Sequence, residues 1–496
     1  MQALLPQYSS LLVTLQQIAL RSDCYLIARI QDKKSKFVNV VGDKIEQARK
    51  DHIKGIGMRI FTKNGNNAFG SIDDINNEKE VIECLKQIIY SAKQAEKFNF
   101  DKNKEIFKLK PNKDIVIPQT KYSFDGIELN EIKNRLVYLN KKVKEIIPAV
   151  VNSFFNIEEE VWRITRSDKT DVSFKIPRSF FYANLTYKKD SQTIQRLLRL
   201  SGKSYEILLE GKNIDQLIEK AKDLASIFPK LIEAPKYKSG HYDLLIDADL
   251  AGVLIHEAFG HAAESDSSLY GSVLSKKGKF LKGKKVASSV VSIYDYAKED
   301  ERGFYPYDSQ GVKRKKIKIV DKGILKESIS DVYTAKITGQ SLTGGSKAEF
   351  YTSIPVPRMS NIVLKIEKII DGAFLRKDTS VEKFHKLLID KKILKGSRKI
   401  IYLQGSSGGQ VDPTKGVFML GTNVLFELTK DSIKLCKPAS FSGSILEALK
   451  SIKFGIGKYS NFPGSCGKAN QWVPVSNTAN QFVFISKNKG IKIGGN

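Results

Sequence analysis

The chain has 496 residues, of which 41% are hydrophobic and 27% are charged, a composition that is typical of globular proteins and excludes the disordered and fibrous classes. Its length predicts two domains. The net charge of +28 would suit a nucleic-acid partner if the basic residues were clustered. They are mostly lysines spread along the whole chain, which favours a solvated lysine surface over an anionic partner and makes nucleic acid an unexpected ligand.

The cysteines and the N-terminal segment indicate a reducing compartment. Cys24, Cys84, Cys436 and Cys466 are far apart and form neither a CxxC pair nor a dense disulfide framework. The first twenty residues lack a basic region, and Pro6 with its polar neighbours interrupts their apolar run, so we expect no signal peptide. An uninterrupted apolar stretch of about 18 residues, as a spanning helix requires, does not occur. We therefore expect a cytoplasmic protein without a membrane segment.

The first half alternates helical and strand patterns. Apolar residues at helical spacing predict a helix over 11–20, and the apolar run after it predicts a strand over 24–30. Asn-Gly and Gly turns predict a tight hairpin between Ile60 and Phe69. The further predicted elements of this half are a helix after Asp74, a long helix from Asn130 to before Pro148, strands over 151–187 and a helix over 213–228.

The segment APKYKSG at 234–240 combines turn-forming residues between a helix and a new apolar run, and predicts the domain boundary. Beyond one helix near 249–264, most segments are short and alternating, and two of them, IKIVDKGILKES and LFELTKDSIKL, are typical of hairpins. We therefore expect an α+β fold with a mixed α/β domain over 1–235. A β-rich catalytic domain over 236–496 would contain the one helix that is a candidate for metal binding.

A histidine motif carries the strongest chemical signal. The chain has five histidines, and two of them, His256 and His261, stand in HEAFGH with Glu257 beside the first. Two neutral imidazoles can bind a divalent metal while a nearby carboxylate, itself not a ligand, takes a proton from the attacking water. The alternative interpretation is a pair of histidines on a helix surface or in a core.

The spacing of the two histidines is unusual for a helix. Five steps of about 100° leave the rings about 140° apart, too far around a regular helix to reach one metal. The helix must therefore be distorted between His256 and His261, and a π-bulge, with its i to i+5 repeat, would restore a common face. Gly260 is the residue that would tolerate this distortion or the close approach of another chain segment. Asp247 and Asp249 can cap the helix.

A catalytic zinc site needs a third protein ligand, which the motif does not supply. Spacing leaves five candidates open: Glu264, Asp266, His241, His385 and Cys466. The first two can equally be surface carboxylates at a helix end, and a single cysteine is more often a small buried hydrophobe than a ligand.

The segment around Cys466 has features that would suit a ligand. Gly464 and Gly467 predict a turn-like loop there, and Lys468 could favour the thiolate that a metal requires.

Two segments together, HEAFGHAAESD at 256–266 and GSCGKANQWVPV at 464–475, resemble the TldD type of the TldD/PmbA (TldD/TldE) metallopeptidase family. The segments at 55–73, 353–361 and 405–418 resemble the same family in the same order. The resemblance implies that His256, His261 and Cys466 bind Zn²⁺ and that Glu257 is the general base. Substrate preference stays open, because Ala469 to Trp472 depart from the Gly- and acid-rich stretch expected there.

The resemblance also implies an activity, a class of substrate and a partner subunit. We expect a zinc metallopeptidase that hydrolyses unfolded or extended peptides, in peptide maturation or turnover, with the peptide added like a strand. Arg358, Gln410 and Asp412 are candidates for the substrate channel, with solvated loop residues as the alternative. The family implies a homodimer, or a heterodimer with a metal-free PmbA/TldE-type subunit.

Two other function classes compete with the peptidase. One is a DNA gyrase-modulating or other regulatory binding protein without required peptidase activity, although the chain supplies no recognisable DNA-reading helix. The other is an inactive scaffold subunit, which would have no need of the general base Glu257.

Overall fold

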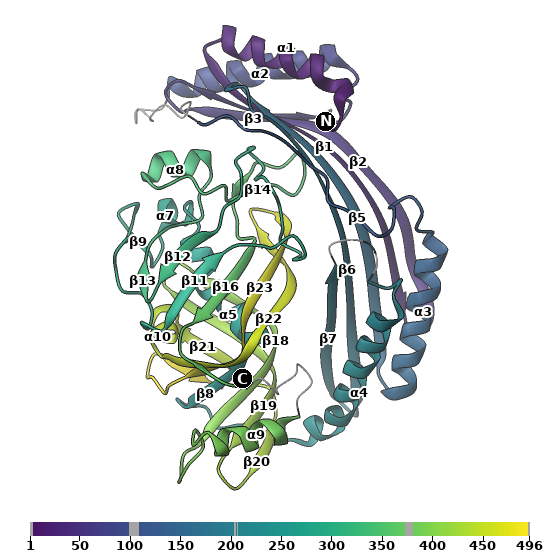
Figure 1. Cartoon of the computed structure of the whole chain (residues 1–496), viewed down its shortest axis with the longest axis vertical. Coiled ribbons are helices and arrows are strands. Elements are labelled where there is room, and N and C mark those ends of the chain that lie inside the picture. Colours follow the sequence, from purple (N-terminus) through teal and green to yellow (C-terminus); the bar gives the residue numbers. More distant parts are fainter. Residues whose placement is uncertain (1–2, 99–108, 203–204, 206, 373–379, 495–496) are drawn as a thin grey trace.

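The computed structural model describes residues 3–98, 109–202, 205, 207–372 and 380–494. It has the α+β architecture that the sequence predicts, with a long curved sheet built by the first half and a larger sheet built by the second half (Figure 1). The second half lies on the concave side of the curved sheet (Figure 1). In the described part of the chain, no helix combines the length and apolar character needed to cross a membrane.

The curved sheet consists of seven described strands. They are β1 (Cys24–Val41), β2 (Lys44–Thr62), β3 (Asn67–Ile72), β4 (Lys113–Val116), β5 (Val150–Arg166), β6 (Asp171–Lys189) and β7 (Gln192–Gly202). Their order is β3-β2-β1-β5-β6-β4, and β7 also pairs with β6. The predicted hairpin between Ile60 and Phe69 is confirmed as β2 and β3.

Strand β1 is much longer than the predicted strand over 24–30. It continues through the polar segment QDKKSK because β2 and β5 pair with it on both sides over this length. The charges are compensated across the sheet: Lys33 lies 2.9 Å from Glu158 and 3.3 Å from Glu160 of β5. Alternating apolar residues mark only the part of a strand that faces an apolar core, so the strand predicted from this pattern was too short.

The predicted helices of the first half are confirmed, and they cover the curved sheet in two groups. Helices α1 (Ser9–Arg21) and α2 (Glu78–Glu96) lie at one end, and α3 (Leu129–Ile146) and α4 (Gly211–Glu233) lie at the other (Figure 1). The first pair packs through Leu11, Leu15 and Leu85. The second pair packs through residues such as Leu136 and Leu217. A short 3₁₀ turn, η1 (Pro6–Tyr8), precedes α1.

The larger sheet runs in the order β13-β12-β11-β16-β23-β8-β18-β19-β21-β24, with β17, β20 and β22 paired at its sides. The strands of the second half are β8 (Asp243–Asp247), β9 (Ser275–Lys276), β10 (Lys279–Phe280), β11 (Val291–Asp295), β12 (Ile317–Asp321), β13 (Ile324–Leu325), β14 (Ser346–Lys347), β15 (Val356–Pro357), β16 (Asn361–Ile366), β17 (Ile369–Ile370), β18 (Ile400–Asp412), β19 (Val417–Leu428), β20 (Ile433–Cys436), β21 (Ser440–Ser444), β22 (Ile452–Lys468), β23 (Gln471–Ile485) and β24 (Ile491–Ile493). The helices outside the histidine motif are α7 (Ser267–Tyr270), α8 (Val332–Thr338), α9 (Val381–Asp390) and α10 (Ile445–Lys450).

The two predicted hairpins of the second half are confirmed as β12–β13 and β19–β20. The described strands of the curved sheet end at Gly202 and those of the larger sheet begin at Asp243, while a boundary at residue 235 stays a prediction. An apolar cluster that includes Trp162 and Phe174 from the curved sheet and Tyr305 and Tyr307 from the second half joins the two parts.

The segment around Cys466 is a strand and not the turn-like loop that its glycines predict. Gly464 and Gly467 lie inside β22, which pairs with β23 up to Lys468. The turn follows at Ala469 and Asn470, whose φ angles are 52° and 56°. Positive φ at both central residues is the geometry of a two-residue hairpin turn of type I′. The loop prediction was wrong because glycine inside a strand marks close approach of a neighbour as well as turns.

The helix with the histidine motif begins directly after the central strand β8. It consists of α5 (Ala248–Ile255), a π-helical turn η2 (His256–Gly260) and α6 (His261–Ala263). Asp247 caps it by accepting from Leu250 N–H at 2.9 Å, as predicted. The predicted π-bulge is confirmed: the N–H of His261 donates to the carbonyl of His256, five residues earlier.

Glycine lets this helix approach its neighbours closely. A Cβ at Gly260 would lie 2.0 Å from the Met359 sulfur, and both residues are buried. Gly260 has ordinary helical dihedral angles, so its role is close contact and not an unusual backbone conformation. Of the two reasons that the sequence offered for this glycine, the structure supports the approach of another chain segment.

We expect Gly260→Ala to lower the free energy of unfolding by about 1 to 3 kcal/mol, because the new methyl group overpacks the contact with Met359. Urea unfolding measures this loss. Gly211→Ala is the matched control, since a Cβ there meets nothing within 4 Å and should change stability by less than about 1 kcal/mol. Equal losses in the two variants would contradict the contact.

Candidate metal centre

Three potential metal ligands meet where the motif helix contacts the β22–β23 hairpin. One donor atom from each of His256, His261 and Cys466 lies within 4.8 Å of the other two. The Cys466 sulfur is 3.3 Å from Nε2 of His261, and the two imidazole rings stand nearly perpendicular with centroids 5.1 Å apart. The π-turn thus brings both rings to the same side of the helix, facing the hairpin.

The charges of this cluster stabilise one another. Burial raises the pKa of the Cys466 thiol, but the imidazoles of His256 and His261 lower it by more, to about 4. Burial in turn lowers the pKa of His256, and the Cys466 sulfur more than reverses this effect. The sulfur is therefore held as a thiolate, the form that binds metals.

The donor set fits a divalent metal such as zinc. Two imidazoles and one thiolate are typical zinc ligands, and three protein ligands leave a fourth position open. The other histidines left open by spacing lie elsewhere: His241 bonds the carbonyl of Ile491, and His385 bonds the carbonyl of Thr429.

Each imidazole is held through its second nitrogen. Nδ1 of His256 lies 3.1 Å from the amide oxygen of Asn477, and Nδ1 of His261 lies 3.0 Å from a carboxylate oxygen of Glu264. An acceptor at Nδ1 places the ring proton there and leaves Nε2 free to bind a metal. Glu264, a candidate for the third ligand by spacing, thus contacts a histidine and not the common position of the three donors.

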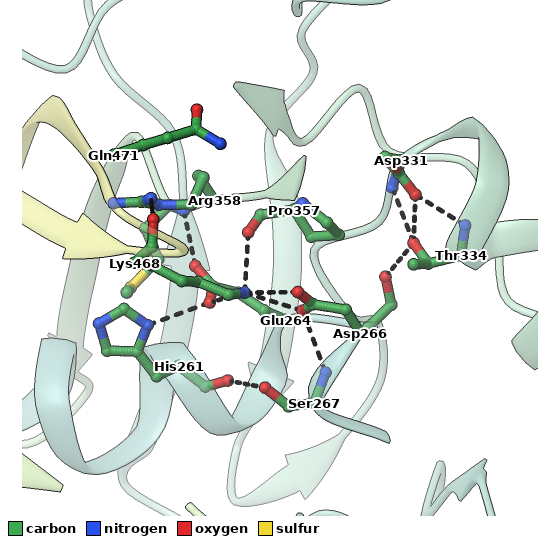
Figure 2. Close-up of polar contacts among 12 residues, drawn as sticks. His261, Glu264, Asp266, Ser267, Asp331, Thr334, Pro357, Arg358, Lys468 and Gln471 are labelled. Atoms are coloured by element: carbon green, nitrogen blue, oxygen red, sulfur yellow. Dashed lines mark hydrogen bonds and ion pairs between the residues drawn. The ribbon is translucent and has the colours of Figure 1, made fainter. Parts of the chain in front are cut away.

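Glu264 is fully buried and lies at the centre of a polar network (Figure 2). Lys468 Nζ lies 2.7 Å from Glu264 and 2.8 Å from Asp266, and the Met359 N–H donates to Glu264 at 3.2 Å. Burial raises the pKa of Glu264, but Lys468 and the histidine hold it well below its usual range. The expectation that Lys468 acts on the Cys466 thiol is not met, because its ammonium group pairs with the two carboxylates.

Arg358 lies inside the protein and contacts the β22–β23 hairpin that carries Cys466. Its side chain is buried and donates to the main-chain carbonyls of Cys466 and of Lys468, the latter at 3.0 Å. Lys468 returns a hydrogen bond to the carbonyl of Pro357 at 3.1 Å. The segment Pro357–Met359 therefore connects the hairpin with the helix. These contacts position the hairpin, and a contact of Arg358 with substrate stays a prediction.

The other two candidates for the substrate channel lie on β18. Gln410 is exposed, and Asp412 accepts from the N–H groups of Thr414 and Lys415, both at 3.0 Å, which is the hydrogen bonding of a turn. Among the described contacts, neither residue touches the cluster of donors. Their role in substrate binding also stays a prediction.

Glu257 lies next to the three donor atoms. Its carboxylate lies 3.9 Å from Nε2 of His261, and its side chain is 24% exposed. Within the described residues, no lysine or arginine forms an ion pair with it. The carboxylate is thus open to a water molecule beside the three donor atoms.

Of the residues that hold the ligands in place, sequence reasoning assigned other roles to Glu264 and Lys468 and left Asn477 and Met359 unnoticed. Asn477 and Met359 carried no signal of their own. Two spacings pointed to the others: Glu264 follows His261 by three residues, one turn of a helix, and Lys468 follows Cys466 by two, which places both side chains on one face of a strand.

The part of the chain that holds this centre is similar to known metalloproteases. Residues 239–477 match the model of the PmbA/TldA metallopeptidase C-terminal domain. A metalloprotease of Archaeoglobus fulgidus is 35% identical over 287 residues, which are 57% of this chain and 59% of that protein. A metalloprotease of Methanocaldococcus jannaschii is 28% identical over 91% of this chain and 94% of its own length. A zinc metalloprotease TldD homologue of Saccharolobus solfataricus is 27% identical over 52% of each chain.

Solved structures share the fold over nearly the whole length. TldE from Thermococcus kodakarensis has a TM-score of 0.71 at 17% identity, covering 98% of this chain and 100% of its own. A Thermotoga maritima protein, described as a candidate modulator of a DNA gyrase, has a TM-score of 0.74 at 15% identity with the same coverage. At these identities the likeness concerns the fold alone. The domain match and the metalloprotease relatives show that residues 239–477 belong to the TldD/PmbA metallopeptidase family.

Proposed function

We propose that this protein is a zinc-dependent peptidase with its active centre at His256, His261 and Cys466. The observation that carries the proposal is the meeting of two imidazoles and a thiolate within 4.8 Å, with the carboxylate of Glu257 beside them. The metalloprotease names of the relatives support the reaction class, and one of them is named a zinc metalloprotease.

A zinc ion bound by these residues would supply Lewis acidity toward water and toward the carbonyl oxygen of the scissile bond. The chain contributes the three ligands and keeps their geometry through Asn477 and Glu264, which hold the two imidazoles at Nδ1. Three ligands from the chain leave room for the reacting groups on the open side.

Glu257 is the general base in this proposal. It takes a proton from the attacking water and passes it to the leaving amine, so that one carboxylate serves both halves of the hydrolysis. Its carboxylate lies 3.9 Å from Nε2 of His261, and this position next to the three donor atoms supports the role. Its partial exposure gives water access to the carboxylate.

We propose an extended or unfolded peptide as the substrate. Strand β18 lies against the π-turn of the motif helix, and its pairing with β19 is interrupted between Ser406 and Gly409. The exposed residues from Ser407 to Gln410 offer main-chain groups near this interruption. Such groups can pair with a peptide backbone as an added strand and read its side chains only weakly.

Glu257→Gln should keep the metal and lose about 100-fold to 10,000-fold of peptide hydrolysis, because only the proton transfer is removed. Cys466→Ala is the paired variant and should lose metal together with activity. Metal content by elemental analysis and turnover of a disordered peptide are measured on both proteins. Near-normal turnover by metal-loaded Glu257→Gln, or unchanged metal content in Cys466→Ala, would contradict the assignment.

We further propose that the chain works as a dimer, with a like chain or with a metal-free PmbA/TldE-type subunit. Support comes from Trp472, which pairs with Gly467 on the face of the hairpin opposite to Cys466 and is 64% exposed. Exposed tryptophans are enriched at protein interfaces.

Sedimentation velocity of the purified chain tests self-association through this face. If like chains pair there, Trp472→Ala should weaken the dimer at least about tenfold. A monomeric wild-type chain would favour the heterodimer, and a wild-type dimer unaffected by Trp472→Ala would remove this face from the proposal.

A further inference from the structure

The β22–β23 hairpin and the helix that carries His256 and His261 meet through an ion pair between Lys468, whose side chain is 22% exposed, and the fully buried Glu264. Cys466 and Lys468 are two residues apart on β22, so their side chains extend from the same face of the strand. Cys466 reaches the imidazole of His261, and Lys468 reaches Glu264, which follows His261 by three residues. The hairpin therefore brings a metal ligand and a cation to the helix together.

Glu264 uses its two oxygens for three different partners. One oxygen accepts from Nδ1 of His261 at 3.0 Å and from Lys468 Nζ at 2.7 Å, and the other accepts from the Met359 N–H at 3.2 Å. The side chain is completely buried, and the described contacts fix it from three directions (Figure 2). Rotation of the His261 ring would break the first of these bonds.

The two imidazoles have unequal partners. His256 faces the neutral amide of Asn477, whereas His261 faces a carboxylate that is itself paired with a lysine. A carboxylate behind a histidine orients the ring and increases its basicity as a ligand more than a neutral amide does. Both imidazoles are therefore held by the hairpin, His256 directly through Asn477 of β23 and His261 through Glu264 and Lys468. Only the connection of His261 includes an ion pair.

We propose that Glu264 is a positioning residue for His261, and that its ion pair with Lys468 sets the distance and angle at which Cys466 and His261 face a common metal. This inference rests on the proposed function, since it takes the cluster to be a metal site. Lys468 of the hairpin contacts Glu264, and Glu264 in turn contacts the imidazole of His261.

The alternative is that the ion pair only stabilises the fold. Removing one partner of any buried pair leaves an uncompensated charge and destabilises a protein wherever the pair lies. Loss of stability therefore does not separate the two roles. Metal affinity and the electronic spectrum of a bound metal do, because they respond to ligand geometry.

The test uses the full chain and two metals. The Zn²⁺ dissociation constant is measured by competition with a chromophoric chelator, and Co²⁺ loading gives the ligand-field and thiolate charge-transfer bands. Glu264→Gln and Lys468→Met should each weaken Zn²⁺ binding by about 10-fold to 100-fold. They should also shift the ligand-field bands, while the charge-transfer band shows that Cys466 still binds.

The double variant Glu264→Gln/Lys468→Met removes the lysine together with its fully buried partner, so that only Asp266, whose side chain is 16% exposed, loses its cation. It thereby guards against misfolding of the single variants. Its Zn²⁺ affinity should be no lower than that of the single variant with the lower affinity, because both substitutions break the same contact between Glu264 and Lys468. Asp168→Asn is the matched control, because it breaks the buried pair with Arg166 in the curved sheet and should leave Zn²⁺ affinity and the Co²⁺ spectrum unchanged.

The outcomes separate this inference from the proposed function. A wild-type chain that binds neither metal would overturn the proposed function and the inference with it. Wild-type binding together with an unchanged Zn²⁺ affinity and an unchanged Co²⁺ spectrum in Glu264→Gln would overturn the inference alone. A loss of affinity of the same size in Asp168→Asn would assign the ion pair a purely structural role.

Discussion

The hydrogen bond from the His261 N–H to the carbonyl of His256 is the interaction on which the candidate centre depends. A regular helix would turn two histidines five residues apart away from each other. The π-turn adds one residue to the helical repeat and returns both rings to one side, where the hairpin meets them. Met359 packs directly against Gly260 in this turn, where a Cβ would lie 2.0 Å from the Met359 sulfur.

The centre is built from the helix with the histidine motif and the β22–β23 hairpin, which are far apart in the sequence. Its geometry depends on the contacts that join these two elements. The segment Pro357–Met359 contacts both of them: Arg358 bonds the hairpin carbonyls, and the Met359 N–H bonds Glu264 on the helix side. The central strand β8 leads into the helix and pairs with β23 of the hairpin, so the large sheet fixes the coarse placement. The polar contacts then fix the fine placement of the donor atoms.

The helices could be predicted from local periodicity, and the short hairpins from their turn residues. The distortion of the helix with the histidine motif followed from the five-residue spacing of its two histidines. The strand predicted for β1 was too short, since Lys33 is satisfied by glutamates across the sheet and not by an apolar face. Spacing left the third ligand open among five residues, because Cys466 and His261 are 205 residues apart and come together only when β23 of the hairpin pairs with β8 before the helix. The contacts of Glu264 with His261 and Lys468 could not be predicted, because they depend on the burial of Glu264 in the folded chain.

If the Cys466 thiolate and two imidazoles bind one metal, the zinc-loaded protein should show this ligand set directly. X-ray absorption at the zinc edge resolves sulfur from nitrogen and oxygen ligands by distance. We expect one sulfur at about 2.3 Å and two imidazole nitrogens at about 2.0 to 2.1 Å from the zinc, with the sulfur absent in Cys466→Ala. A spectrum of the wild-type protein with nitrogen and oxygen ligands alone would contradict this ligand set.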